Sequence, residues 1–167
     1  VTIVLGVNDD AYDSDRHDVI SNASCTTNGL APPMHVVHRE FGVLKGLMTT
    51  VHAYTASQVL VDGPSADLRD ARAAGLSIVP SSTGAARAIG LVIPELQGKL
   101  NGAAYRVPVP TVSIVEFVVQ LAKPASAEAI NDALRAAANG RLDGILDVSD
   151  EPLVSIDLRG NSHSSIV

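Results

Sequence analysis

The amino-acid sequence predicts a domain in which a β-sheet is combined with helices, of the α+β or α/β class. Some segments have apolar residues at helical spacing, whereas in the segment from Val112 to Leu121 the apolar Val115, Phe117, Val119 and Leu121 fall on one side, as in a strand. The chain has 167 residues, 46% of them hydrophobic, which is enough to build one sizeable core. Because only 3% are aromatic and none is tryptophan, we expect a core of Val, Ile, Leu and Ala.

The first helix is predicted directly after the only cysteine. From Thr26 to Phe41 apolar residues recur on one helical face, two prolines fall near its start, and Gly42 ends it. A later helix is capped by Ser126 and stopped by Gly140. The other predicted elements, in chain order, are an opening strand at 1–5, a polar loop at 8–15, an extended segment at 18–21, a strand at 43–54, a loop at 55–65, a helix at 67–74, a helix from 83 to 94, and strands at 103–107, 112–121 and 153–158.

The charge of the chain argues against two classes of partner. Its 18 Asp and Glu outnumber its 12 Lys and Arg, and no basic run occurs, which disfavours nucleic acid and an anionic membrane. We find no membrane span or signal peptide pattern. One cysteine cannot form an internal disulfide, so we expect a reducing compartment, the cytoplasm. Because the chain starts at Val1 and both ends are strand-like, we expect it to be cut from a longer protein.

The best candidate nucleophile is Cys25. It lies among polar neighbours at the start of a predicted helix, where partial positive charge and free backbone N–H groups favour a thiolate. A lone intracellular cysteine is more often buried and inert, but this polar context favours chemistry. His52, at the end of the following strand, is the expected base that accepts the thiol proton. The other histidines are assigned surface or packing roles.

A candidate anion site is predicted further along the chain. Thr83 and Gly84 begin a helix and offer a hydroxyl and free N–H groups, although glycine there is also a common turn residue. Arg106 lies in a predicted strand, where it requires an anion or solvent, and Arg69 and Arg72 add further guanidinium groups. No cluster has metal-ligand spacing, so no metal site is predicted. The 13 glycines contain no Gly-x-Gly, so no dinucleotide cradle is predicted in this chain.

Five segments together match the pattern of one known family. They are SNASCTTN at 21–28 with LAP at 30–32, TTVHAYT at 49–55, STGAA at 82–86, PELQGKL at 94–100 and RVP at 106–108. In this order they resemble the glyceraldehyde-3-phosphate dehydrogenases over nearly the whole chain. The resemblance implies an α+β fold with a mixed, largely antiparallel sheet and helices on one face. It implies that residues 1–22 end a Rossmann-type NAD-binding domain, and that 23–167 form the catalytic domain without its last strand and helix.

The resemblance also implies an oxidoreductase of glycolysis and glucose metabolism. Cys25 would attack the aldehyde of glyceraldehyde 3-phosphate, and His52 would take the proton of the thiohemiacetal as hydride passes to NAD. Inorganic phosphate would then release 1,3-bisphosphoglycerate from the thioester. The implied phosphate-binding residues are Thr55, Arg106 and either Arg72 or Arg69, with Arg72 preferred, for the substrate, and Ser24, Thr26, Thr83 and Gly84 for the attacking phosphate. NAD would be bound mainly by the missing domain, and the family implies a homotetramer.

Two positions depart from the family pattern, and two alternatives stay open. Gly29 stands where many members have a second cysteine, and Ala56-Ser57 replaces an Asn-Asp pair, which affects loop geometry. The segment Asp62 to Ser65 resembles the form of a cofactor-reaching loop that prefers NAD over NADP. Erythrose-4-phosphate dehydrogenase would share the same Cys and His. A non-catalytic binding or assembly module is the other alternative, since this chain alone should transfer no hydride.

Overall fold

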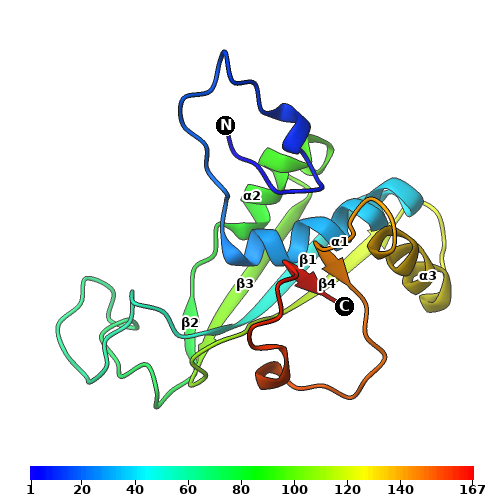
Figure 1. Ribbon diagram of the computed structural model, residues 1–167. Coiled ribbons are helices and arrows are strands. Elements are labelled where there is room, and N and C mark those ends of the chain that lie inside the picture. Colours follow the sequence, from blue (N-terminus) through cyan, green and yellow to red (C-terminus); the bar gives the residue numbers. More distant parts are fainter.

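The computed structural model describes residues 1–167 and shows a mixed sheet with helices on one face (Figure 1). The helices are α1 (Cys25–Phe41), α2 (Ala85–Val92) and α3 (Ala127–Ala138). The strands are β1 (Val43–Ala53), β2 (Val79–Ser81), β3 (Leu100–Val107), β4 (Ile114–Leu121), β5 (Leu146–Asp147) and β6 (Ser165–Ile166). Three short 3₁₀ helices are η1 (Asp9–Ala11), η2 (Pro94–Leu96) and η3 (Ser155–Leu158). No helix is long and apolar enough to cross a membrane.

The main sheet has the strand order β2-β3-β1-β4. Its centre is a parallel pair, β1 with β3, whereas β4 runs antiparallel to β1 and β2 runs antiparallel to β3. The predicted α+β class and mixed, largely antiparallel sheet are therefore confirmed. The parallel register places His52 opposite Arg106 near the ends of their strands. Strands β5 and β6 form a separate two-stranded sheet.

The core lies between the sheet and the helices α1 and α2. On α1, Leu30, Met34 and Val37 follow helical spacing and are almost fully buried in one cluster, to which α2 adds Ile89. The helix α3 packs on α1 through a smaller cluster around Leu134. The buried apolar side chains are mainly Ala, Val, Ile, Leu and Met, as expected for a chain poor in aromatic residues. The opposite face of the sheet has no helix over it (Figure 1).

Most predicted elements are confirmed, with small shifts at their ends. The helix after the cysteine runs from Cys25 to Phe41, and Ser126 caps α3 because its Oγ accepts a hydrogen bond from the N–H of Ala129 at 3.1 Å. The observed β3 starts three residues before the predicted strand, and β4 starts two residues later. The predicted helix from 83 to 94 is α2, which is shorter.

The predicted helix at 67–74 is wrong. The segment forms turns: the N–H of Ala71 bonds to the carbonyl of Asp67 at 3.1 Å, as in one helical turn, but the pattern does not continue. Leu68 is 82% exposed, and only Ala73 and Ala74 at the end of the segment are buried, so no continuous helical face packs against the core. A helix this short is unstable without such packing.

The predicted strands at 1–5 and 153–158 are also wrong, and the observed strands β2 and β5 were not predicted. Residues 1–5 form only an isolated bridge between Thr2 and Ser21. Residues 153–158 have no neighbouring strand and end in η3, where the carboxylate of Asp157 accepts a hydrogen bond from the N–H of Val154 at 2.9 Å. The missed strand β2 has only three residues, including Pro80, and forms by pairing with β3.

Candidate active site

Cys25 is the first residue of α1, where the sequence predicts a nucleophile. Ser24 is the N-cap, and its Oγ accepts a hydrogen bond from the N–H of Thr27 at 3.1 Å, which leaves the N–H groups at Cys25 and Thr26 without helical partners. Cys25 is exposed and free. The turn into the helix passes through Ala23, which has a φ of 58°. This left-handed conformation is uncommon for a residue other than glycine.

His52 and Cys25 are in direct contact. The Nε2 atom of His52 lies 3.2 Å from the Sγ atom of Cys25. Because β1 follows α1 directly and runs back along the sheet, the end of the strand returns to the start of the helix. The His52 side chain is only 8% exposed, so the imidazole is held against the core while its Nε2 faces the sulfur. The predicted pair of thiol and base is brought together by the fold.

The other ring nitrogen of His52 lies among polar groups. Its Nδ1 is 2.7 Å from the carbonyl oxygen of Ala53, and it also contacts the Nη1 of Arg106. Burial lowers the pKa of His52 below its ordinary value of 6.5, the Ala53 carbonyl opposes the shift, and the Arg106 charge adds to the lowering. The imidazole is therefore mainly neutral at pH 7, the form in which one ring nitrogen can accept a proton.

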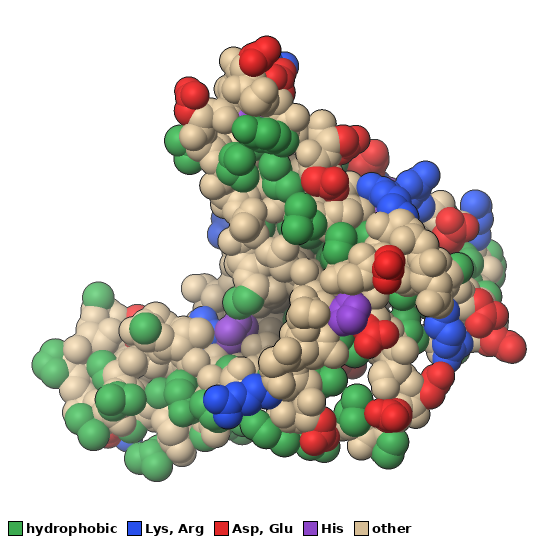
Figure 2. Space-filling view, in the orientation of Figure 1, with side chains coloured by type: hydrophobic (Ala, Val, Ile, Leu, Met, Phe, Trp, Pro, Cys, Tyr) green, Lys and Arg blue, Asp and Glu red, His purple; other side chains and the backbone are tan.

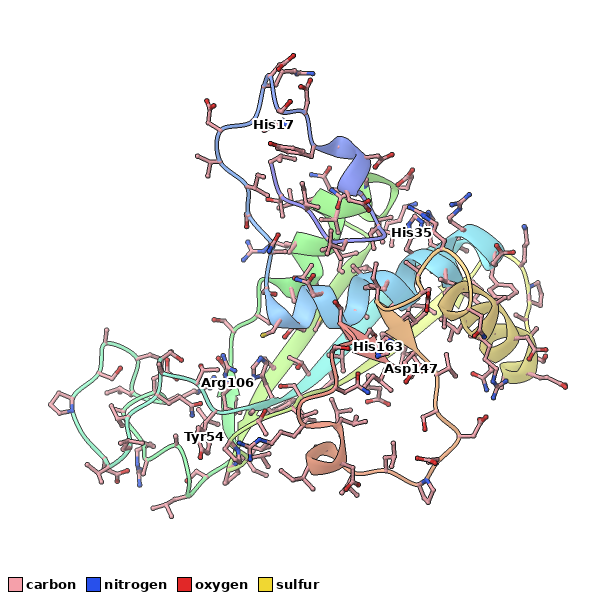
Figure 3. The ribbon with its side chains drawn as sticks, in the orientation of Figure 1. His17, His35, Tyr54, Arg106, Asp147 and His163 are labelled. Atoms are coloured by element: carbon pink, nitrogen blue, oxygen red, sulfur yellow. The ribbon has the colours of Figure 1, made fainter.

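A pocket of about 470 Å³ opens beside this pair. Its polar lining side chains include Arg106 from the end of β3, which Figure 3 shows near the start of α1. Thr83 and Gly84 line the pocket at the start of α2, and Thr83 Oγ1 accepts a hydrogen bond from the N–H of Ala85 at 3.1 Å. The pocket therefore presents hydroxyl groups and a guanidinium group, which can hold an anion. The same pocket is also lined by Ser24, Cys25, Thr26 and His52.

The sequence model of the family described as glyceraldehyde 3-phosphate dehydrogenase, C-terminal domain, matches residues 24–167. The chain belongs to this family. Glyceraldehyde-3-phosphate dehydrogenase from Mycobacterium avium is 61% identical over 166 residues, which are 99% of this chain and 49% of that protein. Glyceraldehyde-3-phosphate dehydrogenase 2 from Bacillus subtilis is 57% identical over 167 residues, and the Geobacillus stearothermophilus enzyme is 58% identical over 167 residues. These cover 100% of this chain and 49% and 50% of the relatives, so the chain spans about half their length.

Not all residues that the family resemblance assigns to phosphate binding lie together. Thr55 lines a second cavity of about 580 Å³, on the other side of Cys25 and His52. Arg72 lines neither cavity, because its Nε lies 3.1 Å from Asp62 Oδ2 and both side chains are more than half exposed. Arg69 likewise lines neither cavity. The loop at 55–78 that holds both arginines extends away from the helices (Figure 1).

Two features of this family member were missed by sequence reasoning. The left-handed conformation of Ala23 has no signal in the sequence, because glycine or asparagine would be expected there. Thr50 lines the pocket beside Cys25, is 1% exposed, and its hydroxyl has no hydrogen-bond partner. The position of Thr50 two residues before His52, on the same face of β1, was the only available signal. No group of three or more His, Cys, Asp or Glu side chains is arranged to hold a metal ion.

Proposed function

We propose that this chain supplies the catalytic part of an NAD-dependent, phosphorylating glyceraldehyde-3-phosphate dehydrogenase. The observation that supports it most directly is the contact of 3.2 Å between Cys25 Sγ and His52 Nε2 beside a polar pocket. A neutral, mostly buried imidazole next to a thiol at a helix start is suited to nucleophilic attack on a carbonyl. The relatives that match the whole chain are named for this activity.

In the proposed reaction, the Cys25 thiolate attacks the aldehyde carbon and forms a thiohemiacetal. His52 then takes the hydroxyl proton at Nε2 as a hydride leaves the same carbon, which oxidises the thiohemiacetal to a thioester. Inorganic phosphate attacks the thioester, and the S–C bond breaks to release 1,3-bisphosphoglycerate and the Cys25 thiolate. Backbone N–H groups at the start of α1 are placed to stabilise the negative oxygen that develops in each attack.

The two phosphate groups of this reaction need two positions near Cys25. Ser24, Thr26, Thr83 and Gly84 line one pocket, and we assign them to the attacking phosphate. Arg106 lines the same pocket, and Thr55 lines the neighbouring cavity, so the proposed site for the substrate phosphate lies between the two. For Arg72 to join it, its ion pair with Asp62 has to open and the 55–78 loop has to move. That contact is exposed, so little free energy opposes its opening.

NAD, when bound, would supply the hydride acceptor. The cavity of about 580 Å³ beside Cys25 has space for a small ring, but the chain has no Gly-x-Gly loop to hold dinucleotide phosphates. We therefore propose that residues 1–22 are the end of a dinucleotide-binding domain and that 23–167 belong to the catalytic domain. The family match that begins at residue 24 supports this boundary. A free thiol at Cys25 is consistent with the cytoplasm as the proposed location.

The substrate is tested in the protein that joins this chain to its proposed dinucleotide-binding domain. With NAD and inorganic phosphate, we expect glyceraldehyde 3-phosphate to be oxidised with a kcat/KM at least tenfold above that for erythrose 4-phosphate, measured by absorbance of the reduced cofactor. The reverse preference would support the erythrose-4-phosphate alternative. No oxidation of either aldehyde would support the non-catalytic binding module.

The open face of the sheet supports the proposed homotetramer. Leu47 and Val118 are directly opposite each other on β1 and β4 and are 63% and 67% exposed. The 55–78 loop is also rich in exposed apolar side chains and forms the lobe seen at the lower left of Figure 2. These exposed side chains are Leu60, Val61, Leu68, Leu76 and Ile78. Exposed apolar surface of this kind is typical of subunit contacts.

We predict that the chain associates with itself and that Val118→Lys reduces this association. A charge at the centre of the apolar face costs desolvation in any contact that buries it. Light scattering at several protein concentrations measures the effect. The control is Glu128→Lys, an exposed position of α3 on the helix side of the sheet, and it should leave association unchanged. A monodisperse monomer for the unmodified chain would contradict the proposal.

A further inference from the structure

A cavity between α1 and α3 lies apart from the proposed active site. It has a volume of about 320 Å³ and is lined by residues of both helices and of the turn that follows α3. His35, which lines it, is on the same helix as Cys25, and their separation in the sequence corresponds to about 15 Å along the helix axis. No residue lines both this cavity and either of the two beside Cys25.

Two exposed guanidinium groups meet the imidazole of His35 at this cavity. The Nη1 of Arg141 donates a hydrogen bond to the Nε2 of His35 at 2.8 Å, since a guanidinium can only donate. Arg39 lines the cavity from the last turn of α1. Burial lowers the pKa of His35, and the nearby charges of Arg141 and Arg39 lower it further, while Glu95, outside the cavity, opposes the shift. Figure 2 shows Lys and Arg side chains gathered over the end of α1 where Figure 3 labels His35.

These two arginines have hydrogen-bond donors that no carboxylate of the chain uses. The ion pairs of the structure are formed by Arg72 and Arg135, and neither Arg39 nor Arg141 takes part in one. The bond from Arg141 to His35 uses one N–H group, and a guanidinium has five. The remaining donors form a planar fork that matches the two oxygens of a carboxylate.

The rest of the cavity wall is apolar. Val36 and Leu142 line it and are only 7% and 1% exposed, so they form a buried floor. Ala133, Ala136 and Ala137 line it from α3, and their small side chains leave space for a ligand. Ligand sites commonly combine such an apolar wall with a few polar groups that fix orientation.

The balance of charge favours a ligand with a single negative charge. Glu40 also lines the cavity, so two arginines, one carboxylate and a neutral His35 leave one net positive charge. A carboxylate has one negative charge near pH 7, whereas a phosphate monoester has nearly two and would be repelled more strongly by Glu40.

We propose that this cavity is an accessory binding site for a small organic carboxylate with an apolar body. The guanidinium groups of Arg39 and Arg141 bind the carboxylate, and the apolar body lies on the wall formed by α1 and α3. The contact with His35 holds the Arg141 side chain in place before the ligand arrives. The site is independent of the proposed dehydrogenase function.

The test is a ligand-detected NMR titration of the protein that joins this chain to its proposed dinucleotide-binding domain, with phenylacetate as the probe. We expect phenylacetate to bind at least tenfold more tightly than phenylethanol, which lacks the charge, and than acetate, which lacks the apolar body. Saturating inorganic phosphate, which would occupy the proposed active-site pocket, should leave phenylacetate binding unchanged.

Variants assign the binding to this cavity. Arg39→Leu and Arg141→Leu should each weaken phenylacetate binding at least fivefold. Ala136→Glu should do the same, because it adds a negative charge at an exposed position of the wall. The control is Arg87→Leu, an exposed arginine of α2 that lines neither this cavity nor the two beside Cys25, and it should bind as the unmodified protein does.

The proposal is overturned if phenylacetate does not bind, if phenylethanol binds equally well, if phosphate displaces the probe, or if a folded arginine variant keeps the full affinity. Circular dichroism shows whether each variant is folded. If neither arginine variant folds, Ala136→Glu decides. The titration uses neither an aldehyde nor a hydride acceptor, so its failure is distinguishable from a failure of the dehydrogenase assay.

Discussion

Replacing Cys25 by serine is expected to lower the oxidation of glyceraldehyde 3-phosphate by roughly 10⁴- to 10⁶-fold, the range seen when a covalent nucleophile is removed. A serine hydroxyl is a far weaker nucleophile than a thiolate near pH 7. The exposed position at the first residue of α1 tolerates the change without repacking, because the helix is capped by Ser24 and not by Cys25. The loss would therefore report chemistry and not folding.

The measurement is cofactor reduction in the protein that includes the proposed dinucleotide-binding domain, with far-ultraviolet circular dichroism to show that the variant is folded. Cys25 is the only cysteine in the chain, so alkylating the unmodified joined protein with iodoacetamide should cause a comparable loss by blocking this thiol. The Cys25→Ser variant should be insensitive to this reagent. Activity within tenfold of the unmodified protein would show that the thiol is not the nucleophile.

Replacing His52 by asparagine is expected to lower the same activity by roughly 10²- to 10⁴-fold, the usual contribution of a general base. The unmodified protein should also lose activity as the pH falls below 6.5. The pKa of His52 is lowered by burial, so the neutral base persists to a pH below the ordinary histidine value and is lost as the pH falls through the folded value. In His52→Asn this loss at acid pH should disappear.

The stability of the folded chain should also fall at acid pH, for the same reason as the activity. A histidine with a lowered pKa favours the folded state above its unfolded value of 6.5, and this contribution is lost as the pH falls through the lower folded value.

The matched control for the activity measurement of His52→Asn is His38→Asn. His38 Nδ1 accepts a hydrogen bond from the N–H of Val43 at 3.0 Å at the other end of α1, so this variant should keep the loss of activity at acid pH. If His38→Asn and His52→Asn gave the same pH profile, His52 would not be the base.

The parts of the fold that could be predicted are those determined by neighbouring residues. The helix after Cys25 and the helix after Ser126 have local caps and apolar faces, and in β4 every second residue from Val115 to Leu121 is apolar. The pairing of Cys25 with His52 was predictable for the same reason. Cys25 begins a helix and His52 lies at the end of the strand that follows this helix directly. The distance between their reacting atoms required the structure.

The parts that could not be predicted depend on contacts between distant residues. Nothing local indicates that β1 and β3 are parallel and that His52 lies opposite Arg106, 54 positions later. The strand β2 exists because β3 offers a free edge, and the segment at 67–74 stays in turns because its large apolar side chain, Leu68, finds no surface to pack on. The ion pair between Arg72 and Asp62 likewise follows from how the 55–78 loop folds back on itself.

The proposed reacting residues and most of the proposed binding residues come from different stretches of the chain. The proposed nucleophile and base, Cys25 and His52, come from one continuous stretch of helix and strand, whereas the pocket groups from Thr83 to Arg106 come from a later stretch joined to it by the exposed 55–78 loop. Substitutions of Thr83 or Gly84 in the later stretch would leave the contact between Cys25 and His52 in place, whereas a change of Arg106 would also remove a contact of His52. The proposed reacting pair can therefore be held constant while the proposed binding groups at the start of α2 are varied.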